Sequence, residues 1–215
     1  MIHDVSHEDE VQITVEDGRI LSGEIAVPKH AKAVIIFAHG KGSSSRSPRN
    51  KYMAEILQKE HFATLLIDLL TDEEAQDDDS QFDVDVLAKR LAHVRQWVDN
   101  NPHTEGLMIG LVGSSSGASA ALKTVAKLDN NIGAVVSRGG RPYLALDVLD
   151  KIKVPVLLLV GGKDKDELKM NQQAFEKLNT TKELQVIEGA SHLFSEEGKL
   201  EEAAEFTRDW FLSHI

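Results

Sequence analysis

Near its middle the chain runs Gly110-Leu-Val-Gly113-Ser-Ser115-Ser-Gly117-Ala-Ser-Ala-Ala. The apolar residues 107–112 predict a buried strand, and the small residues 117–125 predict a helix packed closely on a sheet. Between them lies Gly-x-Ser-x-Gly, centred on Ser115. This spacing is typical of a strained strand-to-helix turn that exposes a serine hydroxyl, with glycines where side chains would clash. Backbone N–H groups at the start of the helix, that of Ser116 first, can then stabilise an oxyanion.

The motif alone has a second interpretation. Three consecutive serines in a stretch rich in Gly and Ser can match by accident, and a glycine-rich turn with solvent-facing hydroxyls would have the same sequence. The strand before and the helix after favour a catalytic serine, which requires a base and an acid elsewhere in the chain.

Length and composition exclude several classes of protein. With 215 residues, 41% of them hydrophobic, the chain is expected to form one globular domain over residues 1–215. No apolar run reaches the ~20 residues of a membrane helix and no signal-peptide pattern is present, so we expect a cytoplasmic protein. The absence of cysteine excludes disulfides, thiolate metal sites and a cysteine nucleophile. The net charge of -11 argues against nucleic acid or anionic membrane as partner.

Much of the negative charge lies in Asp72-Glu-Glu-Ala-Gln-Asp-Asp-Asp79, which we expect to be a solvated, mobile loop. A metal site built from these carboxylates is the alternative, but the ligand spacing of an EF-hand loop is missing. The chain also lacks His-Glu-x-x-His, which disfavours a metal hydrolase.

Apolar runs and amphipathic segments alternate along the chain. Residues 11–15 and 20–27 flank a turn and predict an antiparallel hairpin at a sheet edge. Further strands are predicted at residues 33–38, 62–67, 107–112, 132–137, 154–160 and 184–188. Helices are predicted from Pro48 onward and at residues 84–98, 117–125, 144–149, 167–178 and 196–214. This alternation implies an α/β fold with a doubly wound, mostly parallel sheet.

In such sheets, functional groups gather at the carboxyl ends of the strands. Loops expected there carry Ser115, Asp164 and His192, in that chain order. Ser115 would attack a carbonyl carbon, His192 would carry the proton, and Asp164 would orient the imidazole and stabilise its cation. The alternatives are a surface histidine for His192 and a helix cap for Asp164, with Asp166 as a rival for either role. The order of all three on suitable loops favours the catalytic interpretation.

A second loop at this edge reads His39-Gly-Lys41-Gly and follows a predicted strand. The backbone N–H of Lys41 is expected to join that of Ser116 in an oxyanion hole. A phosphate cradle is the alternative, but the P-loop spacing is absent, as is the Gly-x-Gly-x-x-Gly of a dinucleotide site.

Over essentially its whole length the chain resembles the alpha/beta-hydrolase superfamily, and within it the small, cap-less dienelactone-hydrolase-like group. The resemblance rests on His39-Gly-Lys-Gly-Ser-Ser, Ser47-Pro-Arg-Asn50, residues 62–70, Gly113-Ser-Ser-Ser-Gly117, Ser137-Arg-Gly-Gly-Arg-Pro142, Gly161-Gly-Lys-Asp164 and Ala190-Ser-His-Leu-Phe194. It implies hydrolysis of an ester or related acyl compound without cofactor or metal. Dienelactone hydrolases use a cysteine nucleophile where this chain has Ser115, which favours a carboxylesterase.

About a dozen residues separate Ser137 from Asp150, fewer than a cap domain usually needs. We therefore expect no large cap and an open site suited to short acyl groups. Four arginines are expected in loops at or beside this edge, where a guanidinium could hold the carboxylate or phosphate of an anionic substrate: Arg46, Arg49, Arg138 and Arg141. Of these, Arg46, Arg138 and Arg141 are the candidates for binding the substrate. Pairing with nearby acids to brace the loops is the alternative.

The leading hypothesis is thus a serine carboxylesterase acting on a small ester, as a monomer or homodimer. A thioesterase, amidase or acyltransferase would use the same three residues with a different leaving group or acceptor. A non-catalytic binding module on the same fold is the third hypothesis, and the presence of Ser115 with His192 argues against it.

Overall fold

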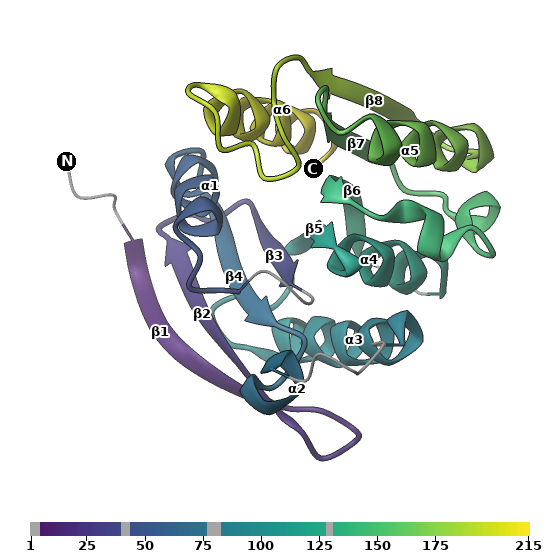
Figure 1. Ribbon diagram of the computed structural model, residues 1–215. Helices are drawn as coiled ribbons and strands as arrows, with labels where there is room; N and C mark the ends of the chain where they lie inside the picture. Colours follow the sequence, from purple (N-terminus) through teal and green to yellow (C-terminus); the bar gives the residue numbers. More distant parts are fainter. Residues whose placement is uncertain (1–4, 40–43, 77–82, 128–130) are drawn as a thin grey trace.

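The computed structural model of the chain describes residues 5–39, 44–76, 83–127 and 131–215. Within them, eight strands form one sheet in the order β1-β2-β4-β3-β5-β6-β7-β8 (Figure 1). The strands are β1 (Val5–Thr14), β2 (Ile20–Pro28), β3 (Ala33–His39), β4 (Phe62–Asp68), β5 (Met108–Ser115), β6 (Ile132–Gly140), β7 (Val156–Gly161) and β8 (Lys182–Ile187). The α-helices are α1 (Pro48–Lys59), α2 (Asp72–Gln76), α3 (Val84–Asn100), α4 (Ser116–Lys127), α5 (Lys165–Lys177) and α6 (Lys199–His214). Two 3₁₀ turns, η1 (Pro142–Ala145) and η2 (Leu149–Lys151), lie between β6 and β7.

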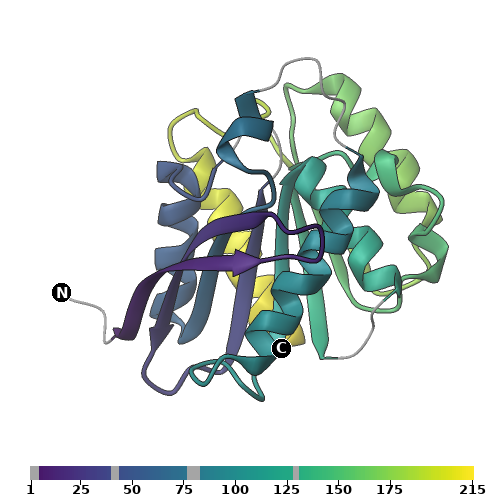
Figure 2. The ribbon, with the colours of Figure 1, turned by 90° about the horizontal axis from the view of Figure 1, so that it is seen from below.

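The sheet is mostly parallel, as predicted. Strands β3 to β8 pair in parallel, whereas β1 pairs antiparallel with β2, and β2 with β4. The β1–β2 hairpin lies at one edge of the sheet (Figure 2). This is the α/β-hydrolase architecture expected from the alternation of strands and helices.

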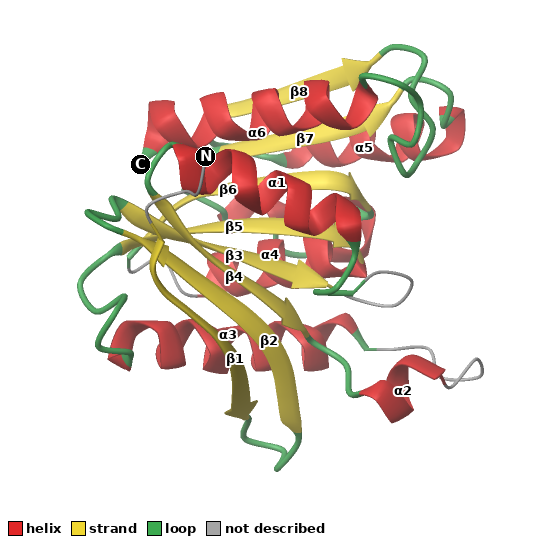
Figure 3. Cartoon of the chain, turned by 90° about the vertical axis from the view of Figure 1, so that its left-hand side faces the viewer, coloured by secondary structure: helices red, strands yellow, loops and turns green. Residues whose placement is uncertain are grey.

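Helices cover both faces of the sheet (Figure 3). On one face, α1 and α6 pack on a cluster that includes Phe37 and Val136. On the other, α3, α4 and α5 pack on a cluster that includes Ile36 and Val135. Because both faces are covered, every residue of β3 is buried, which explains its unbroken apolar sequence.

Several predicted boundaries were wrong. Strand β1 starts at Val5, well before residue 11, because an edge strand is held by backbone pairing to β2 and needs no apolar pattern. Strand β6 continues past Ser137 to Gly140, so Arg138 lies in a strand and not in a loop. The helix predicted at residues 144–149 is replaced by η1 and η2.

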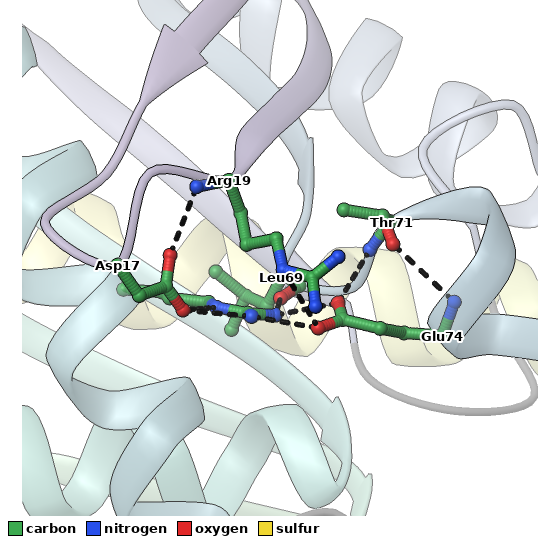
Figure 4. Close-up of polar contacts among 6 residues, drawn as sticks. Asp17, Arg19, Leu69, Thr71 and Glu74 are labelled. Carbon is green, nitrogen blue, oxygen red and sulfur yellow. Dashed lines mark hydrogen bonds and ion pairs between the residues drawn. The ribbon is translucent and has the colours of Figure 1, made fainter.

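The acidic segment that begins at Asp72 is also more ordered than predicted. Residues Asp72–Gln76 form α2, and Glu74 accepts hydrogen bonds of 2.8 Å on both carboxylate oxygens from Arg90 of α3 (Figure 4). Arg90 also donates to Asp17 in the hairpin turn and to the carbonyl of Leu69 after β4. One buried guanidinium therefore joins the hairpin, the exit of β4 and α2 to α3. Asp77, Asp78 and Asp79 lie outside the described residues.

None of the helices in the described residues is long and apolar enough to span a lipid bilayer.

Arg90→Met keeps the side-chain length but removes all of these donors. We expect the free energy of unfolding to fall by about 2–3 kcal/mol, because Glu74 is mostly buried and Leu69 loses a donor, while half-exposed Asp17 contributes less. Urea unfolding at neutral pH measures this loss.

Hydrogen bonds from Arg90 lower the pKa of Glu74 to about 2. The contribution of Glu74 is therefore complete above its ordinary pKa of 4.5, and the difference between the two proteins should shrink as pH falls from there toward about 2.

The matched control is Arg208→Met, which removes an exposed pair with Asp209 and should cost less than about 0.5 kcal/mol. Equal losses in the two variants would contradict a structural role for the Arg90 contacts.

Candidate active site

The chain passes from β5 into α4 without a loop, since Ser115 ends the strand and Ser116 begins the helix. Ser115 has φ of 50°, in the left-handed region that side chains other than glycine rarely adopt. A Cβ atom on Gly113 would overlap the backbone of Ala118, so the first turn of α4 can pack here only against glycine. The strained turn predicted from Gly-x-Ser-x-Gly is confirmed.

Asp164 and His192 meet beside this turn. The Nδ1 atom of His192 lies 3.1 Å from Oδ2 of Asp164, while Oδ1 of the same carboxylate accepts from the backbone N–H of Glu167 at 3.4 Å. Asp164 is therefore both the N-cap of α5 and the partner of the imidazole, whereas Asp166 is exposed on the first turn of that helix. With Nδ1 donating to the carboxylate, Nε2 of His192 is left to accept a proton.

The end of β6 contacts both the segment that carries Ser115 and the segment that carries His192. Gly140 is the register partner of Ser115, and the N–H of Arg141 donates to the Ser115 carbonyl at 3.1 Å. Gly139 has φ of 50°, and a Cβ atom there would lie 2.8 Å from the carbonyl oxygen of His192. Two adjacent glycines thus contact the two segments, Gly140 the one that carries the serine and Gly139 the one that carries the histidine.

Glu196 holds the loop that carries His192, a role that sequence analysis missed. Its Oε2 atom accepts from the backbone N–H of Ser191 at 2.9 Å and from the Ser191 hydroxyl at 3.1 Å. Its Oε1 atom lies 3.0 Å from Nζ of Lys163, next to Asp164. The bond from the Ser191 backbone and then the one from Lys163 lower the pKa of Glu196 to about 2. The contact with Lys163 joins two loops that are 33 residues apart in the sequence, so no local pattern records it.

Of the two residues predicted for the oxyanion hole, Ser116 has the expected position. It is the first residue of α4, so its N–H is one of those that a helix leaves without an intrahelical partner. Lys41 lies outside the described residues.

The three arginines predicted to bind substrate lie in different environments. Arg138 is only 6% exposed and donates to Asn50 of α1 at 2.8 Å, a position that argues against contact with substrate. Arg46 is exposed near Asp68, at the end of β4 and two strands away from β5. Arg141 is exposed directly after the register partner of Ser115, with its Nε atom 3.5 Å from Oε1 of Glu167. Only Arg141 is both exposed and adjacent to the serine.

Glu167 contacts Arg141 and lies near Asp164, and the sequence alone did not single it out. Burial raises its pKa, and the neighbouring Asp164 adds to this, while Arg141 acts in the opposite direction.

Among the described residues, no three His, Asp or Glu side chains are grouped so that they could hold a metal ion.

Comparison with known proteins agrees with this fold. Residues 21–212 match the model of the dienelactone hydrolase family. The crystal structure of a dienelactone hydrolase from Anabaena variabilis is 43% identical, with a TM-score of 0.93 over 99% of this chain and 100% of that one. A Mycobacterium tuberculosis protein named "Putative phosphoribosyl transferase" is 44% identical over 208 residues, which are 97% of this chain but 47% of that protein. The chain thus spans about half the length of this curated relative.

An Aquifex aeolicus protein named "Putative carboxymethylenebutenolidase" is 25% identical over 198 residues, covering 85% of each chain. Because the family match extends through nearly the whole sequence and includes the strained serine turn, the chain belongs to the dienelactone hydrolase family.

Proposed function

We propose that this protein is a serine hydrolase that cleaves a small carboxylic ester through an acyl-enzyme intermediate. The observation that carries the proposal is the 3.1 Å contact between His192 and Asp164 beside a serine held at positive φ. Backbone strain at a serine is costly and recurs at catalytic nucleophiles, where it presents the hydroxyl above the sheet. Membership of the dienelactone hydrolase family supports the same chemistry.

In the first half of the reaction, Oγ of Ser115 attacks the ester carbonyl carbon and its proton passes to Nε2 of His192. Asp164 stabilises the imidazolium that forms. The negative charge on the carbonyl oxygen is stabilised by the N–H of Ser116 at the start of α4, with Lys41 as the second donor expected from the sequence. Collapse of this intermediate expels the alcohol, which takes the proton from His192, and leaves an acyl group on Ser115.

In the second half, His192 removes a proton from water, which attacks the acyl carbon. The intermediate collapses to a carboxylic acid and Ser115 regains its proton. A hydroxyl depends more strongly on such a base than a thiol does, because a thiol is partly ionised at neutral pH. Ser115 in place of cysteine therefore increases the reliance on His192.

The substrate is expected to be small. The segment from residue 141 to 155 that joins β6 to β7 contains only η1 and η2, and no cap domain is inserted there. Beside His192, Leu193 is 46% exposed and offers an apolar contact for a short acyl or alcohol group. An open site with little apolar wall gives a long chain no enclosed cavity.

Acyl transfer is the second candidate, because it shares the acylation half-reaction and differs only in the acceptor that replaces water. The transferase name of the Mycobacterium tuberculosis relative belongs to a protein of about twice the length, of which this chain matches one part.

Hydrolysis of p-nitrophenyl esters from acetate to octanoate tests the proposed function. We expect the highest kcat/KM with the shortest chains, and no activity and no fluorophosphonate labelling in Ser115→Ala. Labelling without hydrolysis in the native protein would favour acyl transfer, whereas no labelling would contradict the proposed nucleophile.

Asp164→Asn tests the acid. The asparagine can cap α5 but leaves His192 in the wrong tautomer, so we expect kcat to fall by roughly a thousandfold or more with little change in melting temperature. Asp166→Asn is the matched control on the same helix turn and should keep full activity. The assignment of Asp164 fails if the two variants have similar kcat values.

The anionic-substrate hypothesis now rests on Arg141, since it is exposed beside Ser115. If its guanidinium holds a substrate carboxylate, Arg141→Met should raise KM for esters that carry a free carboxylate by about tenfold, with neutral esters unaffected. Arg46→Met, which removes an arginine two strands away, should change neither. An equal effect of Arg141→Met on both kinds of ester would contradict the hypothesis.

A further inference from the structure

Three polar residues from distant parts of the chain lie buried below the catalytic edge. They are His39 at the end of β3, Asn50 in the first turn of α1 and Arg138 in β6, with exposed fractions of 2%, 0% and 6%. His39 and Arg138 are register partners of the same residue, Ser114, on either side of β5. Their side chains therefore point to the same face of the sheet, the face covered by α1. His39 and Arg138 thus flank Ser114, the residue before the serine, and Asn50 contacts both of them.

Hydrogen bonds join the three residues in a chain in which Arg138 donates to Asn50 and Asn50 donates to His39. Nη2 of Arg138 donates to Oδ1 of Asn50 at 2.8 Å, which orients the amide so that Nδ2 faces away from the guanidinium. Nδ2 then donates to the carbonyl of Ser44 at 2.9 Å and to Nδ1 of His39 at 3.3 Å. Asn50 thus holds the two residues that border residues 40–43, and it does so in an orientation set by Arg138.

The protonation state of His39 follows from these contacts. Its Nδ1 accepts a hydrogen bond, so the neutral ring carries its proton on Nε2. Burial, and then the charge of Arg138, lower the pKa of His39 to about 3. The ring is therefore a fixed neutral group at physiological pH.

Arg138 is a buried cation that is not neutralised by any described carboxylate in contact with it. Its Nε and Nη1 atoms have no hydrogen-bond partner among the described residues, and its one bond goes to a neutral amide. Burial and the nearby positive charge of Arg49 lower its pKa to about 10, so it remains charged at neutral pH. A buried charge without an opposite charge beside it destabilises a fold. Such a charge is retained where it serves a function.

We propose that Arg138, oriented by Asn50, supplies the positive charge beneath Ser115 that stabilises the oxyanion, while Asn50 keeps His39 and Ser44 in place. The inference rests on the proposed serine-hydrolase function and adds to it a stabilising charge, that of Arg138, and a positioning residue, Asn50. A fixed charge below the reacting carbonyl costs no reorganisation during the reaction and acts strongly because water is excluded around it.

Asn50→Asp separates this role from a structural one. The variant has nearly the same shape, and the ion pair of its carboxylate with Arg138 offsets the hydrogen bonds that it loses to His39 and Ser44, so we expect little change in melting temperature. The same carboxylate neutralises the buried charge and cannot donate to His39 or Ser44. We therefore expect kcat to fall by about 10²-fold, with KM changed by less than about threefold. A merely structural role would predict activity that follows stability.

Two further variants sharpen the test. Arg138→Met removes the charge and should lower kcat to a similar extent, whereas Arg138→Lys keeps a charge without the planar fork and should restore part of the loss. Gln58→Glu is the matched control, because it makes the same amide-to-carboxylate change on α1, where Gln58 donates to Thr64. It should leave kcat unchanged.

A spectroscopic measurement tests the hydrogen bonds themselves. Imidazole ¹⁵N shifts of His39 should report a neutral ring protonated on Nε2 throughout about pH 5 to 8, and Asn50→Asp should raise the pKa of His39 by placing a carboxylate at Nδ1. If native protein hydrolyses esters and folded Asn50→Asp keeps the native kcat, this inference alone is overturned. If native protein is neither labelled by fluorophosphonate nor active, the proposed function fails, and the role assigned to Arg138 fails with it.

Discussion

The catalytic edge depends on the direct passage from β5 into α4. Gly113 lets the backbone at Ala118 approach the strand, and the positive φ of Ser115 turns the chain within one residue. This close approach directs the N-terminus of α4 toward the serine. The same helix then holds the next strand, since the Ser119 hydroxyl donates to the carbonyl of Arg141 just after β6. The turn at Ser115 therefore sets the positions of both α4 and the end of β6.

Charged groups of both signs lie near Ser115. On the side of β7 and α5 lie the carboxylates of Asp164 and Glu167, one in contact with His192 and the other beside Asp164. Beneath α1, the buried guanidinium of Arg138 in β6 and the neutral ring of His39 in β3 flank Ser114 on the two strands next to β5. In the proposed reaction a cation forms on the imidazole and an anion on the carbonyl oxygen. Each would therefore develop next to charge of the opposite sign, which is the arrangement that favours both at once.

Buried and exposed polar contacts differ in how much they contribute to the stability of the fold. Near the surface, Glu196 holds the His192 loop and Lys163, and solvent limits how much such contacts stabilise the fold. In the interior, Arg90 joins three separate segments and Asn50 joins two, and there each missing partner would leave a costly unpaired group. The interior contacts are thus expected to contribute more to the stability of the fold than the surface ones.

The sequence by itself determined the class of fold and the three candidate catalytic residues. Strands buried on both faces must be apolar, as in β3, and the close packing at Gly113 permits no side chain, so both leave local patterns. The start of β1, the helical state of residues 72–76 and the burial of Arg138 were decided only by tertiary structure. Strand β1 pairs through backbone groups, which every sequence offers. Helix α2 depends on the contact of Glu74 with Arg90 of α3, and the burial of Arg138 depends on Asn50, 88 residues away in the chain. Contacts of this kind depend on which segments the sheet brings together, and no local pattern records them.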